Sequence, residues 1–338
     1  MIRCAILGAS GFVGGELLRL LEGHSQFAAM RLFGDSKAGQ PAGVVHPQLS
    51  GTIGQVTVDH YASTALEDID LVFAALPHGE SQKIAGEILA SGCKLVDLGA
   101  DFRLRDPARY EHWYGEAHGA PELIERFAFG IPEFHRAAIR ASQAVAAAGC
   151  YPTAAILALR PLIDAGLVDP QSLIVDAASG VSGAGRGVRE ATAFNTVEGS
   201  FSAYGLLDHR HTAEMEQELG ATLLFTPHLA PMARGILATC YGTATRAMRD
   251  DEPLEVLRAA YAGEPFVRVS EAPPATKWVA GSNGAVVTAR YDARTGRVLA
   301  LAAIDNLGKG AAGQMIQCAN LMCGLEETAG LSAQGVFP

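Results

Sequence analysis

The stretch CAILGASGFVGGELLRLLEG, residues 4–23, joins an apolar segment to an amphipathic one through a run of glycines. Gly8, Gly11 and Gly14 follow the spacing GxxGxxG. Glycine permits a tight turn, lets the backbone approach a pyrophosphate, and opens a helix whose N-terminal N–H groups bind that anion. A purely structural turn is the alternative, but the strand before it and the helix expected to Glu22 favour a dinucleotide site. The residues that we predict to bind this cofactor are Gly8, Ser10, Gly11, Phe12 and Val13.

Short apolar strands continue to alternate with amphipathic helices over residues 2–145. This alternation predicts a parallel, doubly wound α/β sheet of the Rossmann type, which we assign to a domain of residues 1–148. Longer strands follow, and residues 149–310 are predicted to form a second, mixed-sheet α+β domain. An apolar helix is expected at about residues 311–325, and we predict that residues 311–338 return to the first domain.

Bulk composition excludes several classes of function. The chain has 338 residues, of which 49% are hydrophobic and 18% charged, and its net charge is −10. An acidic chain without a Lys/Arg run is poorly suited to nucleic acid or to an anionic lipid surface. The sequence starts directly with a strand and holds no apolar run of about 18 residues. We therefore expect a cytoplasmic protein with small-molecule ligands, no nucleic acid and no membrane.

Cys150 stands apart from the other cysteines. It lies between the small-residue run AVAAA and the helical pattern AAILALRPLI, so it is expected at the start of a helix. A helix N-terminus favours the thiolate, which makes Cys150 our candidate nucleophile; an inert buried thiol is the alternative. The six cysteines lack the paired spacing of zinc sites. The residues expected to be reduced members of the core are Cys4, Cys93, Cys240, Cys318 and Cys323.

Candidate partners for this thiol lie in HRHTAE, residues 209–214. His209 and His211 belong to the residue type that titrates near neutrality, and Glu214 could orient a histidine or a substrate amide. Spacing does not separate the two histidines; we favour His211 as the base because it directly precedes the helix that carries Glu214, with His209 recognising substrate. Zinc on the His-x-His pair and a simple helix cap are the alternatives. Since no further ligand clusters there, we predict no metal.

The choice between NADPH and NAD depends on the segment FGDSKAG, residues 33–39. Asp35 lies 21 residues after the last glycine of the triplet and could accept hydrogen bonds from a ribose diol, as in NAD sites. Ser36 and Lys37 could instead donate to a 2′-phosphate. Pro77, after the strand DLVFAAL, belongs either to a second wall of the cofactor pocket or to a plain turn.

Arginines in loops are candidates for substrate binding. Arg103 follows the strand KLVDLG, at the edge of a parallel sheet where ligands bind. Arg186 lies in the glycine-rich segment 179–186, and Arg234 follows Pro-Met-Ala. Each guanidinium could hold a phosphate or a carboxylate, and each could equally form a surface salt bridge.

Segments in an order that spans nearly the whole chain resemble the N-acetyl-γ-glutamyl-phosphate reductase family: GASGFVGGELLRLL, DLGADFRL, AGCYPTAAILAL, VSGAGR, HRHTAEM, PMARGILAT and DNLGKGAAGQMIQ. The resemblance implies NADPH-dependent reduction of an acyl phosphate to a semialdehyde in arginine biosynthesis, through a thioester on Cys150. It implies that Arg103 holds the phosphate and that Ser182, Gly183 and Asn306 help to bind the cofactor. It also implies a catalytic and dimerisation role for the second domain, in a homodimer or homotetramer.

One departure from the family concerns the cofactor. Where many members have Ser-Arg, this chain has Gly34 and Asp35, and an acidic group there would repel a 2′-phosphate. Ser36 or Lys37 would then hold the phosphate, and NAD stays an alternative. Aspartate-semialdehyde dehydrogenase is the nearest rival function, but the histidine of those enzymes corresponds to Ile236 here. A non-catalytic dinucleotide-binding sensor is a rival of another class, and the combination of thiol, histidines and arginines argues against it.

Overall fold

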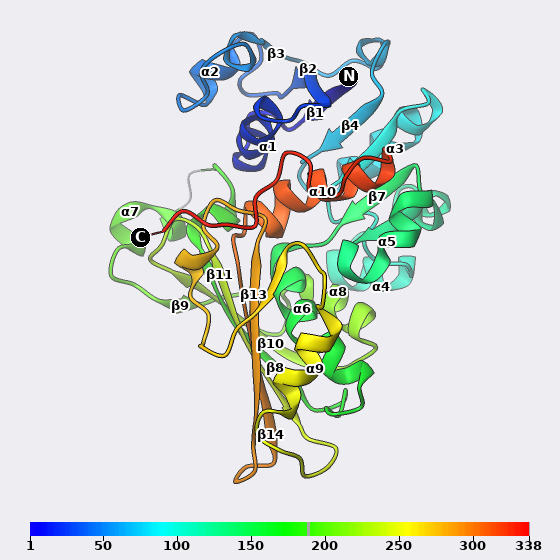
Figure 1. Cartoon of the computed structure of the whole chain (residues 1–338). Helices are drawn as coiled ribbons and strands as arrows, with labels where there is room; N and C mark the ends of the chain where they lie inside the picture. Colours follow the sequence, from blue (N-terminus) through cyan, green and yellow to red (C-terminus); the bar gives the residue numbers. More distant parts are fainter. Residues whose placement is uncertain (188–189, 338) are drawn as a thin grey trace. The chain divides into compact units, whose positions relative to one another are not determined.

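The computed structural model describes residues 1–187 and 190–337, and the described chain forms two compact units (Figure 1). Unit 1 holds residues 1–148 and 311–331, and unit 2 holds residues 149–310 with the C-terminal residues from Ser332 on. Within the described ranges, no helix has the length and apolar character needed to cross a bilayer.

Among its described residues, unit 1 contains a sheet of seven strands in the order β3-β2-β1-β4-β5-β7-β6. Every pairing within this sheet is parallel, which confirms the Rossmann-type prediction. The strands are β1 (Ile2–Leu7), β2 (Phe27–Phe33), β3 (Val58–Asp59), β4 (Leu71–Ala74), β5 (Lys94–Asp97), β6 (Phe127–Gly130) and β7 (Ala144–Ala147). The helices are α1 (Phe12–Glu22), α2 (Ala42–Val45), α3 (Ser81–Ala90), α4 (Pro107–Tyr114), α5 (Pro132–Ala141) and α10 (Gly313–Met322).

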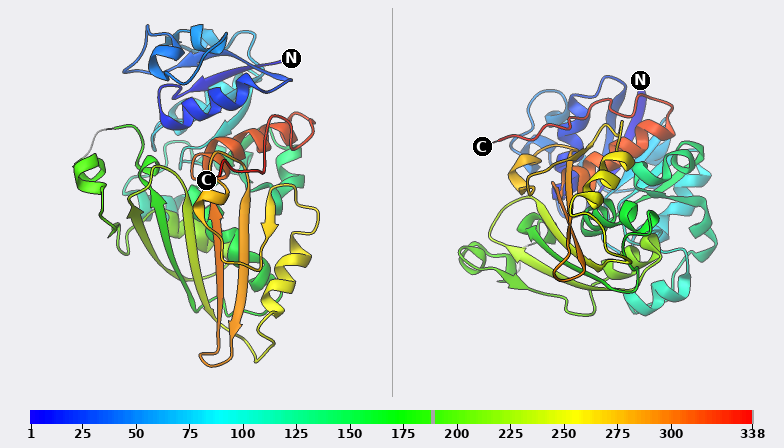
Figure 2. Two further views of the ribbon diagram at one scale, coloured as in Figure 1. Left: turned by 60° about the vertical axis from the view of Figure 1, so that its left-hand side comes forward. Right: turned by 60° about the horizontal axis from the view of Figure 1, so that its bottom comes forward.

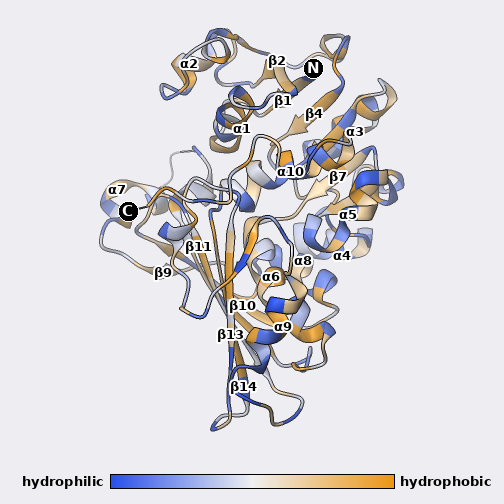
Figure 3. Ribbon diagram, in the orientation of Figure 1, coloured by the Kyte–Doolittle hydropathy of each residue, from blue (hydrophilic) through white to orange (hydrophobic). Residues whose placement is uncertain are grey.

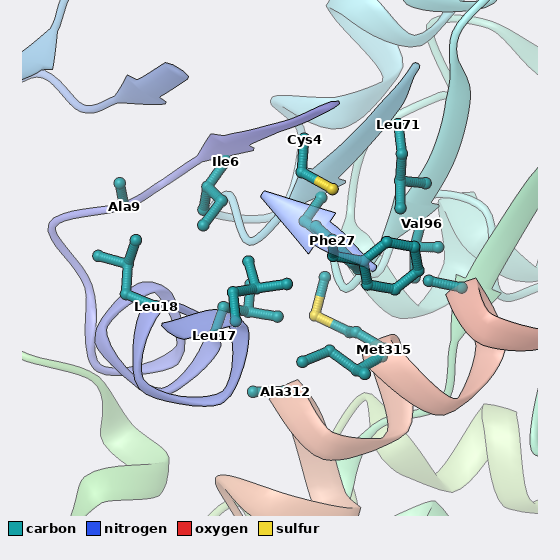
Figure 4. Close-up of a cluster of buried hydrophobic side chains, with 14 of the residues drawn as sticks. Cys4, Ile6, Ala9, Leu17, Leu18, Phe27, Leu71, Val96, Ala312 and Met315 are labelled. Atoms are coloured by element: carbon teal, nitrogen blue, oxygen red, sulfur yellow. The ribbon is translucent and has the colours of Figure 1, made fainter. Parts of the chain in front are cut away.

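Both faces of this sheet are buried. Residues of β1 alternate between two hydrophobic clusters, with Cys4 and Ile6 in one and Ala5 and Leu7 in the other. The first cluster gathers side chains from α1, the central strands and α10 (Figure 4). The second includes Ile88 of α3, which is fully buried. Because side chains fill both faces, the carboxyl ends of the strands are left for ligands.

Among its described residues, unit 2 contains a mixed sheet of seven strands in the order β12-β13-β14-β11-β8-β10-β9. The pairs β8–β10 and β12–β13 are parallel and the other pairs antiparallel, which confirms the predicted second architecture. The strands are β8 (Leu173–Gly180), β9 (Ser202–Ala203), β10 (Leu223–Ala230), β11 (Ile236–Thr243), β12 (Val267–Val269), β13 (Ala285–Asp292) and β14 (Arg297–Ile304), and the long ones run side by side in Figure 2. The helices are α6 (Cys150–Asp164), α7 (Phe194–Val197), α8 (His211–Leu219) and α9 (Glu252–Ala260).

Helices α6, α8 and α9 pack on one face of this second sheet. Along β8 and β11 the other face carries half-buried and exposed side chains, because buried residues alternate with less buried ones in these two strands. Hydrophobic residues are prominent on strands such as β4 and β13 (Figure 3). Short 3₁₀ turns occur at Ile53–Gln55, Ser63–Leu66, Pro121–Arg126, Val181–Ala184, Glu190–Thr192 and Thr276–Trp278, and a π-helical turn, η7, at Gly308–Ala312.

The C-terminal prediction is wrong for the last residues. Residues 311–331 belong to unit 1, but the chain then joins unit 2. The reason is backbone pairing: Asn283 N–H donates to Ser332 O at 2.8 Å, and Val336 N–H donates to Ala280 O at 2.8 Å. The helix α10 is also shorter than expected, because the π-helical turn occupies the residues before Gly313.

Candidate active site

The helix α6 begins at Cys150, as the sequence pattern predicts. Gly149 precedes it in an extended conformation, and its carbonyl accepts a hydrogen bond from Thr153 Oγ1 at 2.9 Å. Cys150 is half-buried and lines a cavity of about 530 Å³ in unit 2, together with His209 and His211. The other lining residues are Tyr151, Ser179, Gly180, Gly183, Ala184, Ala191, Thr192, Ser202, Tyr204, Arg210 and Leu229. Unit 2 therefore brings the predicted nucleophile and both candidate bases to one cavity.

The two histidines differ in their surroundings. His211 is itself the first residue of α8, and its N–H donates to His209 Nδ1 at 3.3 Å. The ring centroids of His209 and His211 lie 5.0 Å apart, and Tyr151 makes edge contacts with both rings. Burial lowers the pKa of His209 to about 4, because the charged ring loses its hydration. His209 is therefore neutral at physiological pH.

Glu214 contacts the backbone that carries the nucleophile. This side chain is 2% exposed, and its Oε1 accepts a hydrogen bond from Gly149 N–H at 2.7 Å. A carboxylate that accepts from a buried N–H satisfies a donor that water cannot reach. Glu214 thus anchors the residue just before Cys150, a contact between positions 65 residues apart that spacing did not predict.

Tyrosines that the sequence did not single out form one wall of the cavity. Tyr204 Oη donates to Tyr151 Oη at 3.1 Å, and Tyr151 Oη donates to His228 O at 3.1 Å. Burial raises the pKa of Tyr204 to about 12 and also raises the pKa of Tyr151. Both hydroxyls are therefore protonated at neutral pH and can serve as hydrogen-bond donors.

The predicted cofactor residues of unit 2 are hydrogen-bonded to one another. Asn306 Nδ2 donates to Ser182 Oγ at 2.9 Å, and Asn306 Oδ1 accepts from Gly235 N–H at 2.7 Å. Ser182 and Gly183 lie in the 3₁₀ turn Val181–Ala184, and Gly183 lines the cavity. These contacts fix the loop after β8 beside the thiol.

The predicted substrate arginines have different environments. Arg234 Nε lies 3.0 Å from Oδ2 of the fully buried Asp305, so its guanidinium already faces a carboxylate of the protein. Arg186 is exposed, on the loop that follows η4 (Val181–Ala184). Arg103 belongs to unit 1, is 6% exposed, and donates from Nη2 to Leu98 O at 2.7 Å.

The glycine turn of unit 1 needs glycine at defined positions. Gly8 has φ +81°, and a Cβ there would lie 2.2 Å from Ala75 O. A Cβ on Gly14 would lie 2.5 Å from Gly8 O. The turn sits at the carboxyl end of β1, since the N–H groups of Gly8 and Ala9 both donate to Phe33 O. This backbone cradle, which opens the helix α1, fits the pyrophosphate of a dinucleotide.

The other cofactor candidates of unit 1 lie in loops that follow strands of the same sheet. Asp35 and Ser36, in the loop after β2, are exposed, and Lys37 is half-buried. Pro77 is exposed in the loop after β4. In the glycine turn itself, Phe12 is 37% exposed. A ligand along this edge could reach any of these side chains.

Beside this edge, unit 1 holds buried carboxyl groups that sequence reasoning missed. Asp97 Oδ1 accepts from Ser81 Oγ at 2.7 Å and from Gly99 N–H at 2.8 Å. Burial raises the pKa of Asp97 to about 6, and its Oδ2 has no hydrogen-bond partner among the described residues. Asp101 accepts from the N–H groups of Gly79 and Gln82. The two carboxyls thus tie the loop after β5 to the start of α3.

Among the remaining cysteines, one differs from the predicted burial in the core. Cys4, Cys93, Cys240 and Cys318 are buried, as predicted. Cys323 is half-buried, because it follows the last residue of α10 rather than facing the interior of that helix. Within residues 1–187 and 190–337, no group of three or more His, Cys, Asp or Glu side chains is arranged to hold a metal ion.

The chain matches known proteins over both of its units. Residues 3–142 match the family model "Semialdehyde dehydrogenase, NAD binding domain", and residues 150–306 match "Semialdehyde dehydrogenase, dimerisation domain". The chain is 44% identical to the N-acetyl-gamma-glutamyl-phosphate reductase of Moorella thermoacetica, with 100% of both chains covered. It is 46% identical to that of Pelotomaculum thermopropionicum, with 100% of this chain and 99% of the relative covered.

Solved structures share the fold at much lower identity. The aspartate semialdehyde dehydrogenase with NADP from Candida albicans aligns with a TM-score of 0.72 and 15% identity, covering 96% of this chain and 98% of the other. The aspartate semialdehyde dehydrogenase II from Vibrio cholerae aligns with a TM-score of 0.72 and 17% identity, with the same coverage. These likenesses establish the fold and leave the substrate to the closer relatives.

Proposed function

Since the chain belongs to the N-acetyl-gamma-glutamyl-phosphate reductase family, we propose that it reduces N-acetyl-γ-glutamyl phosphate to N-acetylglutamate γ-semialdehyde, with release of phosphate, in arginine biosynthesis. The observation that carries the mechanism is the position of Cys150, at a helix start and in one cavity with His209 and His211. A thiol in this setting is suited to covalent catalysis.

In the first step the Cys150 thiolate attacks the acyl carbon of the substrate. The carbon–sulfur bond forms while the bond from carbon to the phosphate oxygen breaks, so phosphate leaves with the bonding electron pair and a thioester remains. N–H groups at the start of α6 can stabilise the oxyanion that develops on the acyl oxygen. The Glu214 contact to Gly149 holds the backbone of this region in place.

NADPH bound at the Gly8 turn would supply the hydride that takes the thioester to the aldehyde level. We assign the proton transfers to His211, which removes the thiol proton at the start, returns it to the alkoxide oxygen that hydride addition leaves, and takes it back when the carbon–sulfur bond breaks to release the semialdehyde and the Cys150 thiolate. His209 is the weaker choice, because burial lowers its pKa to about 4 and its Nδ1 already accepts from His211 N–H. His209 and the tyrosine hydroxyls are then left to recognise the substrate.

The cofactor assignment follows from the turn at Gly8, whose tight backbone suits a pyrophosphate. We propose NADPH, with its 2′-phosphate held by Ser36 or Lys37. The exposed carboxylate of Asp35 favours NAD, so the choice between the two cofactors needs a direct comparison. Pro77 is proposed to border the same pocket, and Ser182, Gly183 and Asn306 to contact the cofactor from unit 2.

For the substrate, Arg103 is proposed to bind the phosphate and Arg186 a carboxylate. Of the three arginines, Arg234 is the least suited to bind the substrate, because its guanidinium already pairs with Asp305. The substrate is a small acyl phosphate, consistent with a cavity of about 530 Å³. As a biosynthetic enzyme of this family, the chain is proposed to act in the cytoplasm.

We propose that unit 2 also assembles the protein into a homodimer or homotetramer. The open face of its sheet carries a row of aligned side chains, because Leu224 and Tyr241 are both in register with Ile174. Leu224 is 48% exposed and Tyr241 is 36% exposed. An apolar row of this kind is suited to burial against a second copy. Sedimentation of the wild type and of Leu224→Lys tests the assignment, since dissociation is expected in the variant.

The proposed function is tested by phosphate-dependent oxidation of N-acetylglutamate semialdehyde with NADP⁺ and with NAD⁺, beside the same assay on aspartate semialdehyde. We expect turnover of the N-acetylated substrate and preference for NADP⁺. Cys150→Ser should abolish turnover while cofactor binding persists, and Cys323→Ser, a half-buried thiol of unit 1, is the matched control. Preference for aspartate semialdehyde would support the rival enzyme, and cofactor binding without turnover would support a sensor.

A further inference from the structure

The segment that follows β14 is organised around a buried carboxylate, Asp305, which is 0% exposed. Its Oδ1 accepts from Leu307 N–H at 2.8 Å and from Gly308 N–H at 3.1 Å. Its Oδ2 accepts from Gly281 N–H at 2.6 Å and lies 3.0 Å from Arg234 Nε. Asp305 therefore binds both its own turn and two neighbouring segments.

This turn passes against the nucleophile. Gly310 N–H donates to Asp305 O at 2.9 Å, within the π-helical turn η7. A Cβ added to Gly310 would lie 2.8 Å from Cys150 Cβ and 3.3 Å from Cys150 Cα. The backbone of Gly310 thus packs directly on Cys150, and a side chain at position 310 would have to displace it.

The same carboxylate also supports the loop on the cavity side. Arg234, its ionic partner, is followed by Gly235, whose N–H donates to Asn306 Oδ1 at 2.7 Å. Gly180 N–H donates to Gly235 O at 2.9 Å, and Gly180 lines the cavity with Cys150. Asp305 is thus linked to the cavity through the turn on one side and through the Arg234 loop on the other.

We propose that Asp305 is a positioning residue for Cys150. Its carboxylate, paired with Arg234, holds the turn in which Gly310 packs on Cys150, and this packing directs the sulfur into the cavity. Nucleophilic attack needs the reacting atoms at defined distance and angle, so a small displacement lowers the rate without loosening substrate binding. In this arrangement the guanidinium of Arg234 pairs with Asp305 and does not bind the substrate. The inference rests on the proposed role of Cys150 as the nucleophile.

The first test adds one methyl group beside Cys150. Gly310→Ala is compared with wild type for kcat and KM in the phosphate-dependent oxidation, and for iodoacetamide alkylation of Cys150 followed by peptide mass spectrometry across pH. We expect kcat to fall about 10–100-fold with KM changed less than about threefold, and the alkylation rate of the ionised thiol to change. Gly86→Ala is the matched control, because a Cβ there makes only an ordinary contact, 3.6 Å from Leu123 Cδ1.

The second test separates the two roles of Arg234. Arg234→Gln, Asp305→Asn and the double variant are compared for kcat, KM and thermal unfolding. If Asp305 positions Cys150, both single substitutions should lower kcat. The fold loss of kcat in the double variant should be smaller than the product of the two single losses, because each single substitution leaves the charge of the other residue unpaired. A rise in KM on Arg234→Gln that is equal in both backgrounds would show substrate binding and overturn this part of the proposal.

The outcomes distinguish this inference from the proposed function. If Gly310→Ala folds with wild-type kcat and alkylation, Gly310 does not position the thiol and the inference fails. If Gly310→Ala does not fold, the Arg234–Asp305 cycle decides, and additive effects on kcat overturn the inference. If Cys150→Ser keeps its turnover, the nucleophile assignment itself fails.

Discussion

The two sheets of this protein bury their residues in different ways. In unit 1 the short strand β4, with the sequence LVFA, is buried at every position, because helices cover both faces of a parallel sheet. In unit 2 buried and half-buried positions alternate along β8 and β11, because helices pack on one face. Unit 1 therefore offers a ligand the edge of its sheet, whereas unit 2 has a partly exposed sheet face along β8 and β11 and a cavity lined by the start of α6.

The two units also differ in the groups that surround their buried carboxylates, Asp97 and Asp305. Asp97 of unit 1 is held by neutral donors and its Oδ2 has no hydrogen-bond partner among the described residues. Asp305 of unit 2 is paired with Arg234 and accepts from backbone N–H groups. Burial raises the pKa of Asp97 to about 6, the nearby Asp101 also raises it, and Arg103 opposes the shift. We therefore expect the stability of unit 1 to depend on pH through Asp97. The stability of unit 2 should depend on the Arg234–Asp305 pair.

The largest expected effect separates cofactor binding from thiol chemistry. Gly8→Ala places a Cβ 2.2 Å from Ala75 O at φ +81°, so we expect a loss of at least about 2 kcal/mol of stability and at least about 100-fold weaker NADP⁺ binding, measured by calorimetry. Gly23→Ala, whose Cβ would lie 3.8 Å from Leu20 O, is the control. Alkylation of Cys150 should stay unchanged in both variants. Loss of thiol reactivity in Gly8→Ala would contradict the assignment of the thiol chemistry to the residues of unit 2.

The second prediction concerns the pH dependence of stability. The folded pKa of Asp97, about 6, lies above the unfolded value near 3.9, so its protonated form stabilises the fold below about pH 4 and that contribution is lost as pH rises through 6. Relative to Asp97→Asn, wild type should lose about 3 kcal/mol of unfolding free energy between pH 3 and 8, measured by urea denaturation. Asp59→Asn, at an exposed position, is the matched control. A constant difference between wild type and Asp97→Asn contradicts the assignment.

A somewhat smaller effect is expected at the backbone contact of unit 2. Glu214→Ala leaves the buried Gly149 N–H without this acceptor and should cost about 1–3 kcal/mol, with a lower kcat. Glu214→Gln keeps an acceptor oxygen and should recover most of the stability, measured by thermal unfolding. Equal losses in the two variants would point to the negative charge, rather than the hydrogen bond, as the contribution of Glu214.

The smallest effect is expected at His209. Because its pKa lies near 4, its protonation cannot produce an acid limb at neutral pH in the profile of kcat/KM. We expect His209→Asn to leave the acid limb in place and to raise KM, whereas His211→Asn removes the limb. If the acid limb of the kcat/KM profile disappears only in His209→Asn, His209 is the general base and His211 recognises the substrate.

Much of the fold could be predicted because its signals are local. The alternation of strands and helices, the glycine triplet and the helix start at Cys150 all depend on residues within a few positions of one another. A turn such as that at Asp305 also has a local signal, since aspartate commonly accepts from N–H groups two and three residues ahead. The return of residues 332–337 to unit 2 had no such signal, because it depends on pairing with a distant loop.

The sequence by itself determined the two architectures, the glycine cradle, the thiol at a helix start and the family. Only the tertiary structure decided which groups face that thiol. Glu214 reaches Gly149 across 65 residues of chain, and Arg234 reaches Asp305 across 71. The low pKa of His209 likewise follows from burial, which no spacing records. The physical reason is that turns and helix starts depend on short-range geometry, whereas burial and ionic partners arise when distant segments pack together.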